Sequence, residues 1–262
     1  MNIMVCIKQV PETTEVKINP ETNTLIREGV KSIINPFDMY AIEEAIRIKE
    51  KFGGKSTVIT MGPPQAESAL REAIAMGIDE GVLISDRAFA GSDTWATSYT
   101  LSSVIKKIGD FDLILCGKQA SDGDTAQVGP GISMHLDIPQ VTYVKKIEEI
   151  KPKDRVARVE RMTEEGFEII QTVLPALFTV VKEINEPRLP SLKGMMRSKQ
   201  AKIAVWTQKE LNLDNQKVGL AGSPTQVVKI FTPPPRIGGQ ILEGESREVV
   251  EKLTGLLKSE IN

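Results

Sequence analysis

The first half of the chain alternates short, almost wholly apolar runs with longer amphipathic ones, and this alternation limits the possible folds more than any other feature. The apolar runs have the length of strands that are buried on both faces of a parallel sheet. The expected strands lie at 3–7, 56–61, 81–84 and 112–116, of which 56–61 also contains Ser56, Thr57 and Thr60. Helices are expected after them, at 36–51, 66–76, 93–109 and 125–136. Strands connected by helices make right-handed crossovers, so the sequence predicts a doubly wound, mostly parallel α/β sheet.

Two helix starts are marked by side chains. Asn35 is expected to cap the first helix, with Pro36 at its first position, and Gly53-Gly54 to end it. Ser92 or Asp93 is expected to cap the third helix, which should end near Gly109.

The pattern changes after Pro139. Strands are expected at 142–147, 155–162 and 168–173, with a hairpin turn at Thr163-Glu164-Glu165-Gly166, and a further apolar strand at 176–181. We expect these to be antiparallel strands added to the sheet. From Glu183 onward the density of prolines favours an extended arm, and a last amphipathic helix is expected at 246–259. The sequence therefore predicts a core of residues 1–184 and a C-terminal part of residues 185–262.

Charge and apolar content exclude several classes of function. The 33 basic and 35 acidic residues give a net charge of −2, which predicts no overall attraction to nucleic acid or to a membrane. No apolar stretch approaches the roughly 18–20 residues that span a bilayer, and Lys8 ends the first apolar run too early for a signal peptide. We therefore expect a cytoplasmic protein without membrane insertion.

Side chains that carry out chemistry unaided are scarce. Cys6 and Cys116 lie in apolar runs without a CxxC pair, so they are expected to be buried and to hold neither zinc nor an iron–sulfur cluster. His135 is the single histidine; a general base is one interpretation, and a structural residue on a helix face is the commoner one. No nucleophile or metal-binding set is evident, so any redox activity requires a bound cofactor.

One loop has the composition of a ligand site. In a doubly wound sheet ligands bind beyond the carboxyl ends of the strands, where the loops at 8–11, 61–64 and 117–124 should converge. The last of these leads into a helix whose N-terminus suits a phosphate, and Gly117 and Gly123 permit close approach of the backbone. Neither the Walker spacing nor GxGxxG is present. From the residues alone, a nucleotide site and an ordinary strand–helix turn both remain open.

The acidic residues of this loop need an explanation. Asp122 and Asp124 would repel a phosphate that they faced, so one of them is expected to cap the following helix or to accept hydrogen bonds from sugar hydroxyls. The two do not form a calcium loop, because the other EF-hand ligands are missing.

Four separated stretches resemble one known family, the beta subunits of electron transfer flavoproteins. The most specific runs from Arg158 to Thr179, through Val159-Glu160-Arg161, Glu164-Glu165-Gly166-Phe167-Glu168 and Pro175-Ala176-Leu177-Phe178-Thr179. The others are 31–38, 117–120 and 185–188, so the resemblance covers nearly the whole chain. It implies a flavodoxin-like, adenine-nucleotide-binding fold, and an alpha subunit as partner that carries an exchangeable, electron-transferring FAD.

The resemblance also implies a set of cofactor-binding residues. These are Cys6 (through its backbone), Asn35, Pro36, Phe37, Asp38, Met61, Gly117, Lys118, Gln119, Ala120, Ser121, Asp122, Gly123, Asp124, Thr125, Ala126, Gln127 and Val128. Housekeeping members of the family hold AMP there as a structural ligand. Electron-bifurcating members hold a second FAD, which takes a hydride from NADH and sends one electron to ferredoxin, a low-potential acceptor, and the other to the alpha-subunit FAD. Residues 124–130 resemble the bifurcating group, with Thr125 and Gln127 as donors to the additional phosphate or the flavin ring.

A second implied site lies at 189–199, which resembles the loop by which beta subunits dock on a flavin dehydrogenase of the acyl-CoA dehydrogenase or lactate dehydrogenase type. Leu192 matches the anchoring leucine, and Met195 and Met196 add adaptable apolar surface. Lys193-Gly194 departs from the housekeeping pattern. The neighbouring basic residues fit a partner-facing surface better than a nucleic-acid site, because no aromatic residue lies among them. A stand-alone nucleotide-binding module and a hydrolase using His135 are the competing hypotheses.

Overall fold

The computed structural model describes residues 1–12, 17–19, 24–26, 31–228, 239 and 241–261. It divides into two units, Met1–Val228 and Lys229–Asn262. The larger unit is built on a nine-stranded sheet in the order β11-β10-β9-β12-β8-β1-β6-β7-β13. The strands are β1 (Asn2–Ile7), β6 (Lys55–Met61), β7 (Glu80–Ile84), β8 (Leu113–Gly117), β9 (Gln140–Lys151), β10 (Val156–Met162), β11 (Phe167–Val173), β12 (Ala176–Val180) and β13 (Ala204–Trp206).

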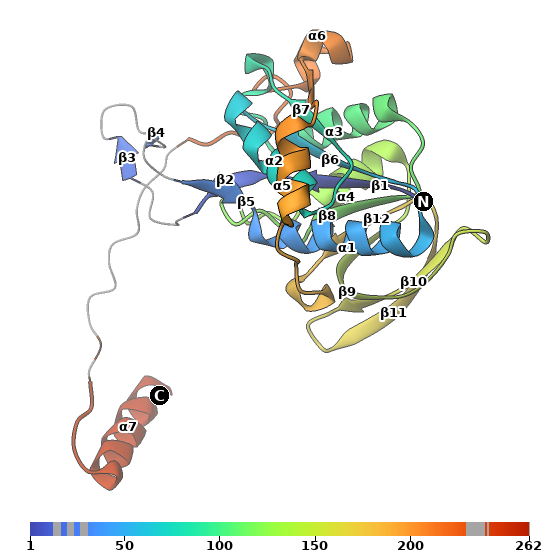
Figure 1. The fold of residues 1–262 in the computed structure, drawn as a ribbon. Coiled ribbons are helices and arrows are strands. Elements are labelled where there is room, and N and C mark those ends of the chain that lie inside the picture. Colours follow the sequence, from blue (N-terminus) through green and yellow to red (C-terminus); the bar gives the residue numbers. More distant parts are fainter. Residues whose placement is uncertain (13–16, 20–23, 27–30, 229–238, 240, 262) are drawn as a thin grey trace. The chain divides into compact units, whose positions relative to one another are not determined.

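Helices cover both faces of this sheet (Figure 1). The helices of the larger unit are α1 (Pro36–Phe52), α2 (Glu67–Met76), α3 (Thr94–Ile108), α4 (Val128–Leu136), α5 (Leu192–Gln200) and α6 (Gln208–Leu211). Short 3₁₀ turns lie at Pro64–Ala66, Arg87–Phe89, Lys182–Ile184 and Asn215–Lys217. Two small antiparallel ribbons complete it, β2 (Gln9–Pro11) with β5 (Ser32–Ile34) and β3 (Lys17–Asn19) with β4 (Thr24–Ile26).

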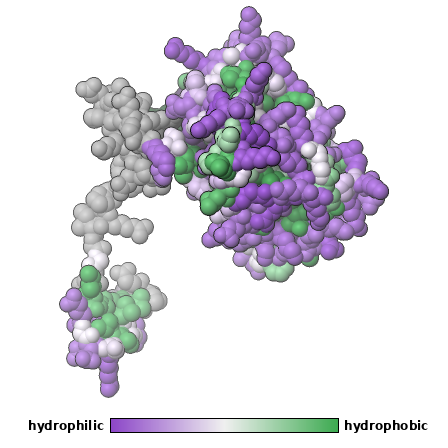
Figure 2. Space-filling model, in the orientation of Figure 1, coloured by the Kyte–Doolittle hydropathy of each residue, from purple (hydrophilic) through white to green (hydrophobic). Residues whose placement is uncertain are grey.

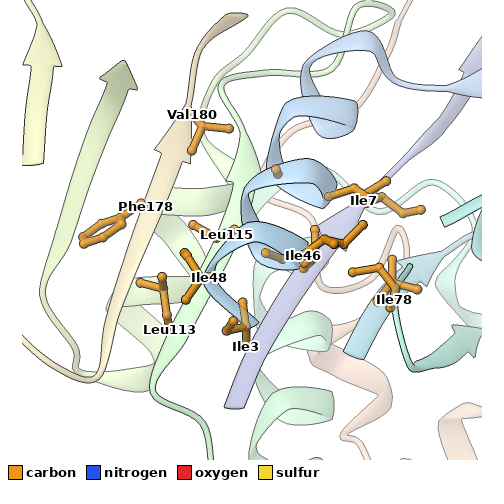
Figure 3. Close-up of a cluster of buried hydrophobic side chains, with 14 of the residues drawn as sticks. Ile3, Ile7, Ile46, Ile48, Ile78, Leu113, Leu115, Phe178 and Val180 are labelled. Carbon is orange, nitrogen blue, oxygen red and sulfur yellow. The ribbon is translucent and has the colours of Figure 1, made fainter. Parts of the chain in front are cut away.

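Alternate residues of each central strand point to two separate cores. On one face, apolar residues of α1 and α2 pack against the sheet; in Figure 3, Ile46 and Ile48 of α1 lie against Ile3 and Ile7 of β1 and Leu115 of β8. On the other face, residues of α3 and α4 pack on Met4, Cys6 and their neighbours. Because both faces are covered, the central strands are buried on both sides and mostly apolar, although β6 also buries Ser56, Thr57 and Thr60.

The strand order reverses at β1. From β1 the chain winds through β6 to β7 on one side, and then returns to place β8 on the other side of β1. Helices α1 and α2 lie on one face and α3 and α4 on the opposite face. The carboxyl ends of β1 and β8 therefore flank a topological switch point, the position where open α/β sheets bind ligands.

The structure corrects three details of the predicted fold. Strand β12 is parallel to both of its neighbours, β8 and β9, and within the nine-stranded sheet of the described residues the antiparallel pairs are β9-β10 and β10-β11. Helix α4 begins at Val128 rather than at 125, because the backbone of Ala126 is left-handed, with φ of 54°. The segment after Glu183 contains α5, β13 and α6, and β13 pairs with β7 at the edge of the sheet.

The smaller unit contains one described helix, α7 (Ser246–Ile261), where the sequence predicted a helix. An apolar stripe runs along it through Val250, Leu253, Leu256 and Leu257, all of which are exposed. Figure 2 shows this hydrophobic surface beside the charged face of the same helix. None of the described helices has the length and hydropathy that crossing a bilayer requires.

Candidate functional site

The three loops that follow β1, β6 and β8 converge, as their positions predicted. Nζ of Lys8, after β1, lies 2.6 and 2.7 Å from the two carboxylate oxygens of Asp122, after β8. The side-chain amide of Gln9 donates to Oγ of Ser68 at 2.9 Å, which joins the first loop to the segment after β6. The start of α1 completes the site, because the backbone N–H of Asn35 donates to the carbonyl of Lys8 at 2.8 Å.

Asn35 holds the loop after β8 with its side chain. Its amide nitrogen donates to the carbonyl of Gln119 at 2.8 Å, and its Oδ1 accepts from the N–H of Ser121 at 3.0 Å. The residue occupies the position before α1 that the sequence predicted, but its side chain makes no capping hydrogen bond to that helix. Because Asn35 is fully buried, these two bonds fix the position of the loop backbone relative to the start of α1.

Asp38 joins two of the loops from beneath. Its Oδ2 accepts from the N–H of Lys8 at 2.7 Å and its Oδ1 from the N–H of Gly117 at 3.1 Å. Burial raises the pKa of Asp38 to about 7, against the two N–H bonds, which favour the ionised form. A Cβ at Gly117 would lie 2.3 Å from Oδ1 of Asp38, so only glycine permits this approach. Both oxygens of Asp38 are thus committed to the loop backbone.

The two acidic residues of the loop do not cap α4, so that part of the sequence prediction is wrong. Asp122 is paired with Lys8, and Asp124 accepts a hydrogen bond from the side-chain amide of Gln119. The residue before α4 is Gln127, and its side chain makes no capping bond. The left-handed backbone at Asp124 and Ala126 turns the chain away from the helical path before α4 begins.

This turn leaves a row of backbone N–H groups without hydrogen-bond partners among the described residues at the N-terminus of α4. Within the described part of the chain, the backbone N–H groups of residues 125–128 make no hydrogen bond. They lie at the positive end of the α4 dipole, an arrangement that binds phosphate. Residues 121–125 are exposed, so a ligand has access to them.

Thr94 is a site residue that the sequence analysis missed. Its Oγ1 donates to Oε1 of Gln127 at 2.9 Å, which leaves both N–H donors of the Gln127 amide free to bind a ligand. Thr94 is the first residue of α3, which Asp93 caps by accepting from the N–H groups of Trp95 and Ala96. Nothing in the local sequence signals this link, because it joins residues 33 positions apart.

The ammonium group of Lys118 lies over two aromatic rings. Its Nζ lies 5.6 Å from the ring centre of Phe37 and 5.2 Å from that of Tyr143, a residue of β9. Tyr143 has a left-handed backbone with φ of 59°, an uncommon conformation for an aromatic residue, and its N–H donates to Oγ1 of Thr179 at 3.1 Å. The ammonium group of Lys118 is thus stabilised by two aromatic rings.

The other predicted cofactor residues surround these three loops. Pro36 is exposed at the start of α1. Met61 is half-buried at the end of β6, and Val128 is half-buried at the start of α4. Cys6 is buried and lies opposite Cys116 in the register of β1 and β8. A hydrogen bond with Cys6 and burial raise the pKa of the Cys116 thiol, so the thiol of Cys116 stays protonated and unreactive.

His135 has the surroundings of a structural residue. Its ring packs against the rings of Trp95 and Tyr99, with centroid distances of 4.6 and 5.8 Å, and burial lowers its pKa. No group of three or more metal-ligating side chains occurs among the described residues. A cavity of about 180 Å³ lies at the opposite end of the sheet, where β1 and β6 begin, and is therefore separate from the loop site.

The segment predicted to be a docking loop is a helix, α5. Ser191 caps it by accepting from the N–H of Gly194 at 3.0 Å. Arg197 donates to the carbonyls of Ile74 and Ile78 at 2.7 and 2.8 Å and so fixes α5 on the end of α2. A Cβ at Gly194 would lie 2.0 Å from the carbonyl oxygen of Ala75, so this glycine allows the close packing.

The outer face of α5 is apolar. The side chains of Leu192, Met195 and Met196 are 73, 43 and 61 % exposed. We call these three residues, with the exposed Leu189 before them, the apolar face of α5. Three lysines border it, Lys193, Lys199 and Lys202, and all three are exposed.

Residues 185–191, which lead into α5 and which we call the strap, are fixed to α1. The guanidinium of Arg188 donates to both oxygens of Glu43, at 2.9 and 3.2 Å, and to both oxygens of Glu50, at 2.6 and 2.9 Å. Burial of Glu43 would raise its pKa, but hydrogen bonds from Arg188 and Arg47 hold the pKa below its usual value. Asn185 adds a bond to the carbonyl of Tyr40 at 3.0 Å. The helix that starts at the loop site therefore also supports α5.

An open, doubly wound α/β sheet with donor groups gathered at its switch point defines a class of proteins that bind a cofactor at the carboxyl edge of the sheet. Comparison with known proteins identifies the family. Residues 22–211 match the electron transfer flavoprotein domain. The chain belongs to the electron transfer flavoprotein family and is similar throughout to its beta subunits.

Three relatives illustrate the similarity. The beta subunit from Thermoanaerobacterium thermosaccharolyticum is 55 % identical over 260 residues, which cover 99 % of this chain and 98 % of the relative. The caffeyl-CoA reductase–Etf complex subunit CarD from Acetobacterium woodii is 50 % identical, with 98 % of each chain covered. Protein FixA from Azotobacter vinelandii is 49 % identical over 240 residues, which cover 90 % of this chain and 85 % of FixA.

Proposed function

We propose that this chain is the FAD-binding beta subunit of an electron-bifurcating complex of the cytoplasm. In such a complex, bound FAD supplies an acceptor for the hydride of NADH and outlets for one electron to ferredoxin and one, through the alpha-subunit FAD, to a partner dehydrogenase. The observation that carries the proposal is the row of open N–H groups at residues 125–128 beside the oriented amide of Gln127. The similarity to a subunit of a caffeyl-CoA reductase–Etf complex supports it.

In this proposal, some residues of the site bind the cofactor and others hold those residues in place. The N–H groups of residues 125–128 and the hydroxyl of Thr125 bind the phosphates, and the amide of Gln127 donates to a phosphate or to the flavin ring. Asn35 and Asp38 do not need to contact the cofactor. They fix the backbone of the loop after β8, so that these donors are already oriented when the cofactor binds.

The number of cofactors in the native heterodimer tests the proposal. Acid-released ligands should contain two FAD and no AMP per heterodimer. One FAD and one AMP would instead identify a housekeeping subunit, in which AMP is structural and only the alpha-subunit FAD transfers electrons. A colourless chain that binds ATP would contradict both functions. The double variant Thr125→Val, Gln127→Ala should lose FAD while its unfolding stays cooperative; unchanged flavin content would exclude these residues as ligands.

The alpha subunit needs a surface, and the exposed edge of the sheet supplies one. Strand β11 is an edge strand of seven residues on which Phe167, Ile169 and Val173 are exposed at alternating positions, on one face. The opposite edge strand, β13, has only three residues. A long apolar edge attracts other chains unless it is covered, so we propose that the alpha subunit covers β11. The apolar stripe of α7 is a second surface for the same subunit.

The apolar face of α5 is the proposed contact with the partner dehydrogenase, within the C-terminal part 185–262. Leu192, Met195 and Met196 are exposed there on a helix that is fixed at both ends, by Arg188 to α1 and by Arg197 to α2. A rigid apolar surface loses little conformational entropy on binding. The dehydrogenase is expected to be of the acyl-CoA or the lactate type.

A further inference from the structure

Lys8 uses every hydrogen-bonding group that it has on other segments of the loop site. Its backbone N–H donates to Asp38 at 2.7 Å, and its carbonyl accepts from the N–H of Asn35 at 2.8 Å. Its Nζ lies 2.6 and 2.7 Å from the carboxylate oxygens of Asp122. The backbone of Lys8 is therefore fixed to the start of α1, and its ammonium group is held in place on the loop after β8.

The charge of Asp122 would oppose the binding of phosphate. Asp122 lies in the loop whose next residues offer their N–H groups to an anion, and like charges in one site repel each other. In the described part of the chain, Lys8 is the cation that pairs with Asp122. Lys118, in the same loop as Asp122, has its Nζ over the rings of Phe37 and Tyr143. Among the described residues, the hydrogen-bond donor to the carboxylate of Asp124 is the neutral side-chain amide of Gln119.

The ion pair contributes little to the stability of the fold. The side chains of Lys8 and Asp122 are 47 and 32 % exposed, and exposed pairs of this kind stabilise proteins by about 0–1 kcal/mol. Removal of the ammonium group should therefore leave the chain folded. Its consequence is local: the carboxylate of Asp122 remains in the loop without its counter-charge.

We propose that Lys8 is a positioning residue that neutralises Asp122, and thereby sets the affinity of the loop after β8 for the phosphates of an adenine nucleotide. The inference rests on the proposed cofactor site. It assigns to Lys8 a role that acts through Asp122, and it requires no direct contact between Lys8 and the nucleotide.

A double-mutant cycle in the purified heterodimer tests this role. The variants are Lys8→Met, Asp122→Asn and the two combined, each stripped of nucleotide and titrated with FAD and with AMP. Lys8→Met should weaken binding by about tenfold, within the range of coupling between contacting charges. The double variant should bind more tightly than Lys8→Met and approach Asp122→Asn, because no carboxylate remains to be neutralised. Lys8→Arg should bind like the wild type.

Two results would overturn the proposal. Unchanged affinity in Lys8→Met would show that the charge of Asp122 does not matter. A double variant as weak as Lys8→Met would show that the ammonium group serves the nucleotide directly. Lys55→Met is the matched control, because Lys55 pairs with Glu80 at 2.7 Å with similar exposure at the other end of the sheet, and it should bind like the wild type. A wild-type heterodimer that binds neither FAD nor AMP would refute the cofactor site itself, and that failure is separate from any difference between variants.

Discussion

The backbone N–H of Ser121 donates a hydrogen bond to Oδ1 of Asn35 at 3.0 Å, although the two residues are 86 positions apart in the sequence. The amide nitrogen of Asn35 makes the reciprocal contact two residues earlier, at the carbonyl of Gln119. The side chain thus satisfies both sides of one turn of the loop after β8. The shape of the loop after β8 is therefore set by a buried residue of another segment.

Replacement of Asn35 should weaken both the fold and the site. In Asn35→Ala the carbonyl of Gln119 and the N–H of Ser121 lose their partners, which costs about 1–3 kcal/mol in the free energy of unfolding. Because the loop is no longer fixed, the nucleotide content of the purified heterodimer should also fall. Urea unfolding and acid release of ligands measure the two effects.

Asn185→Ala separates these effects. Asn185 makes similar bonds, from its amide nitrogen to the carbonyl of Tyr40 at 3.0 Å and to Glu44 at 2.9 Å, at the strap before α5. This variant should lose a comparable amount of stability and keep its nucleotide. Equal nucleotide loss in both variants would mean that instability alone empties the site.

The proposed alpha-subunit surface predicts a contrast between the two edges of the sheet. Ile169→Lys places a charge on β11, where the side chain is 55 % exposed, and should lower the yield of heterodimer because a buried unpaired charge opposes association. Val205→Lys makes the same change on β13, where the side chain is 45 % exposed, and should leave assembly intact. Co-purification with a tagged alpha subunit provides the measurement. Equal yields from the two variants would place the interface elsewhere.

The apolar face of α5 predicts a defect that is confined to the partner. Leu192→Ala should reduce electron transfer to the dehydrogenase, with a rise in KM of about tenfold or more for a buried anchor. NADH-dependent reduction of the flavins should not change, since Leu192 is 73 % exposed and belongs to α5 rather than to the loops of the site. Met134→Ala is the control, because Met134 is 71 % exposed on α4, which packs on the opposite face of the sheet from α2, the helix to which α5 is joined. A loss in both variants would argue against a specific contact at Leu192.

The sequence predicted those features of the fold that depend on neighbouring residues better than those that depend on contacts between segments distant in sequence. The central strands were recognisable because burial on both faces makes them mostly apolar, and Pro36 and Gly53 marked the ends of α1. The parallel pairing of β12 could not be predicted, because nothing within residues 176–180 distinguishes a parallel from an antiparallel neighbour. Helix α5 was missed because its stability comes from Arg197 and the close packing at Gly194, both contacts with α2.

The loop site shows the same division. Its position at the ends of β1 and β8 followed from the strand–helix alternation, which brings the loops after these strands together. Its internal bonds did not follow, because each joins segments that are distant in sequence: Lys8 with Asp122, Asn35 with Ser121, and Thr94 with Gln127. The left-handed backbone of Ala126, which delays the start of α4, is likewise compatible with its surroundings only in the folded site.

Because the pKa of Asp38 is raised, its contribution to the free energy of unfolding should fall as the pH rises. Most carboxylates have the opposite effect. Its pKa is raised from 3.8 to about 7 by burial, so between these values the folded state binds more protons than the unfolded state. The contribution of Asp38 is fully present below pH 4 and is lost as the pH rises towards 7. His135, with a lowered pKa, changes stability in the opposite direction near pH 6.5, so wild type must be compared with Asp38→Asn.

In Asp38→Asn the amide has one acceptor oxygen for the two N–H groups of Lys8 and Gly117, which costs about 1–3 kcal/mol when Asp38 is protonated in the wild type. At pH 8 the wild type also has to bury a charge, which the variant does not. The difference in unfolding free energy between the two proteins should therefore shrink by about 2 kcal/mol from pH 5 to pH 8, since each unit of pKa shift corresponds to about 1.4 kcal/mol. Urea unfolding at pH 5, 6, 7 and 8 measures it. A difference that stays constant over this range would mean that Asp38 is ionised throughout, and that its two N–H bonds outweigh its burial.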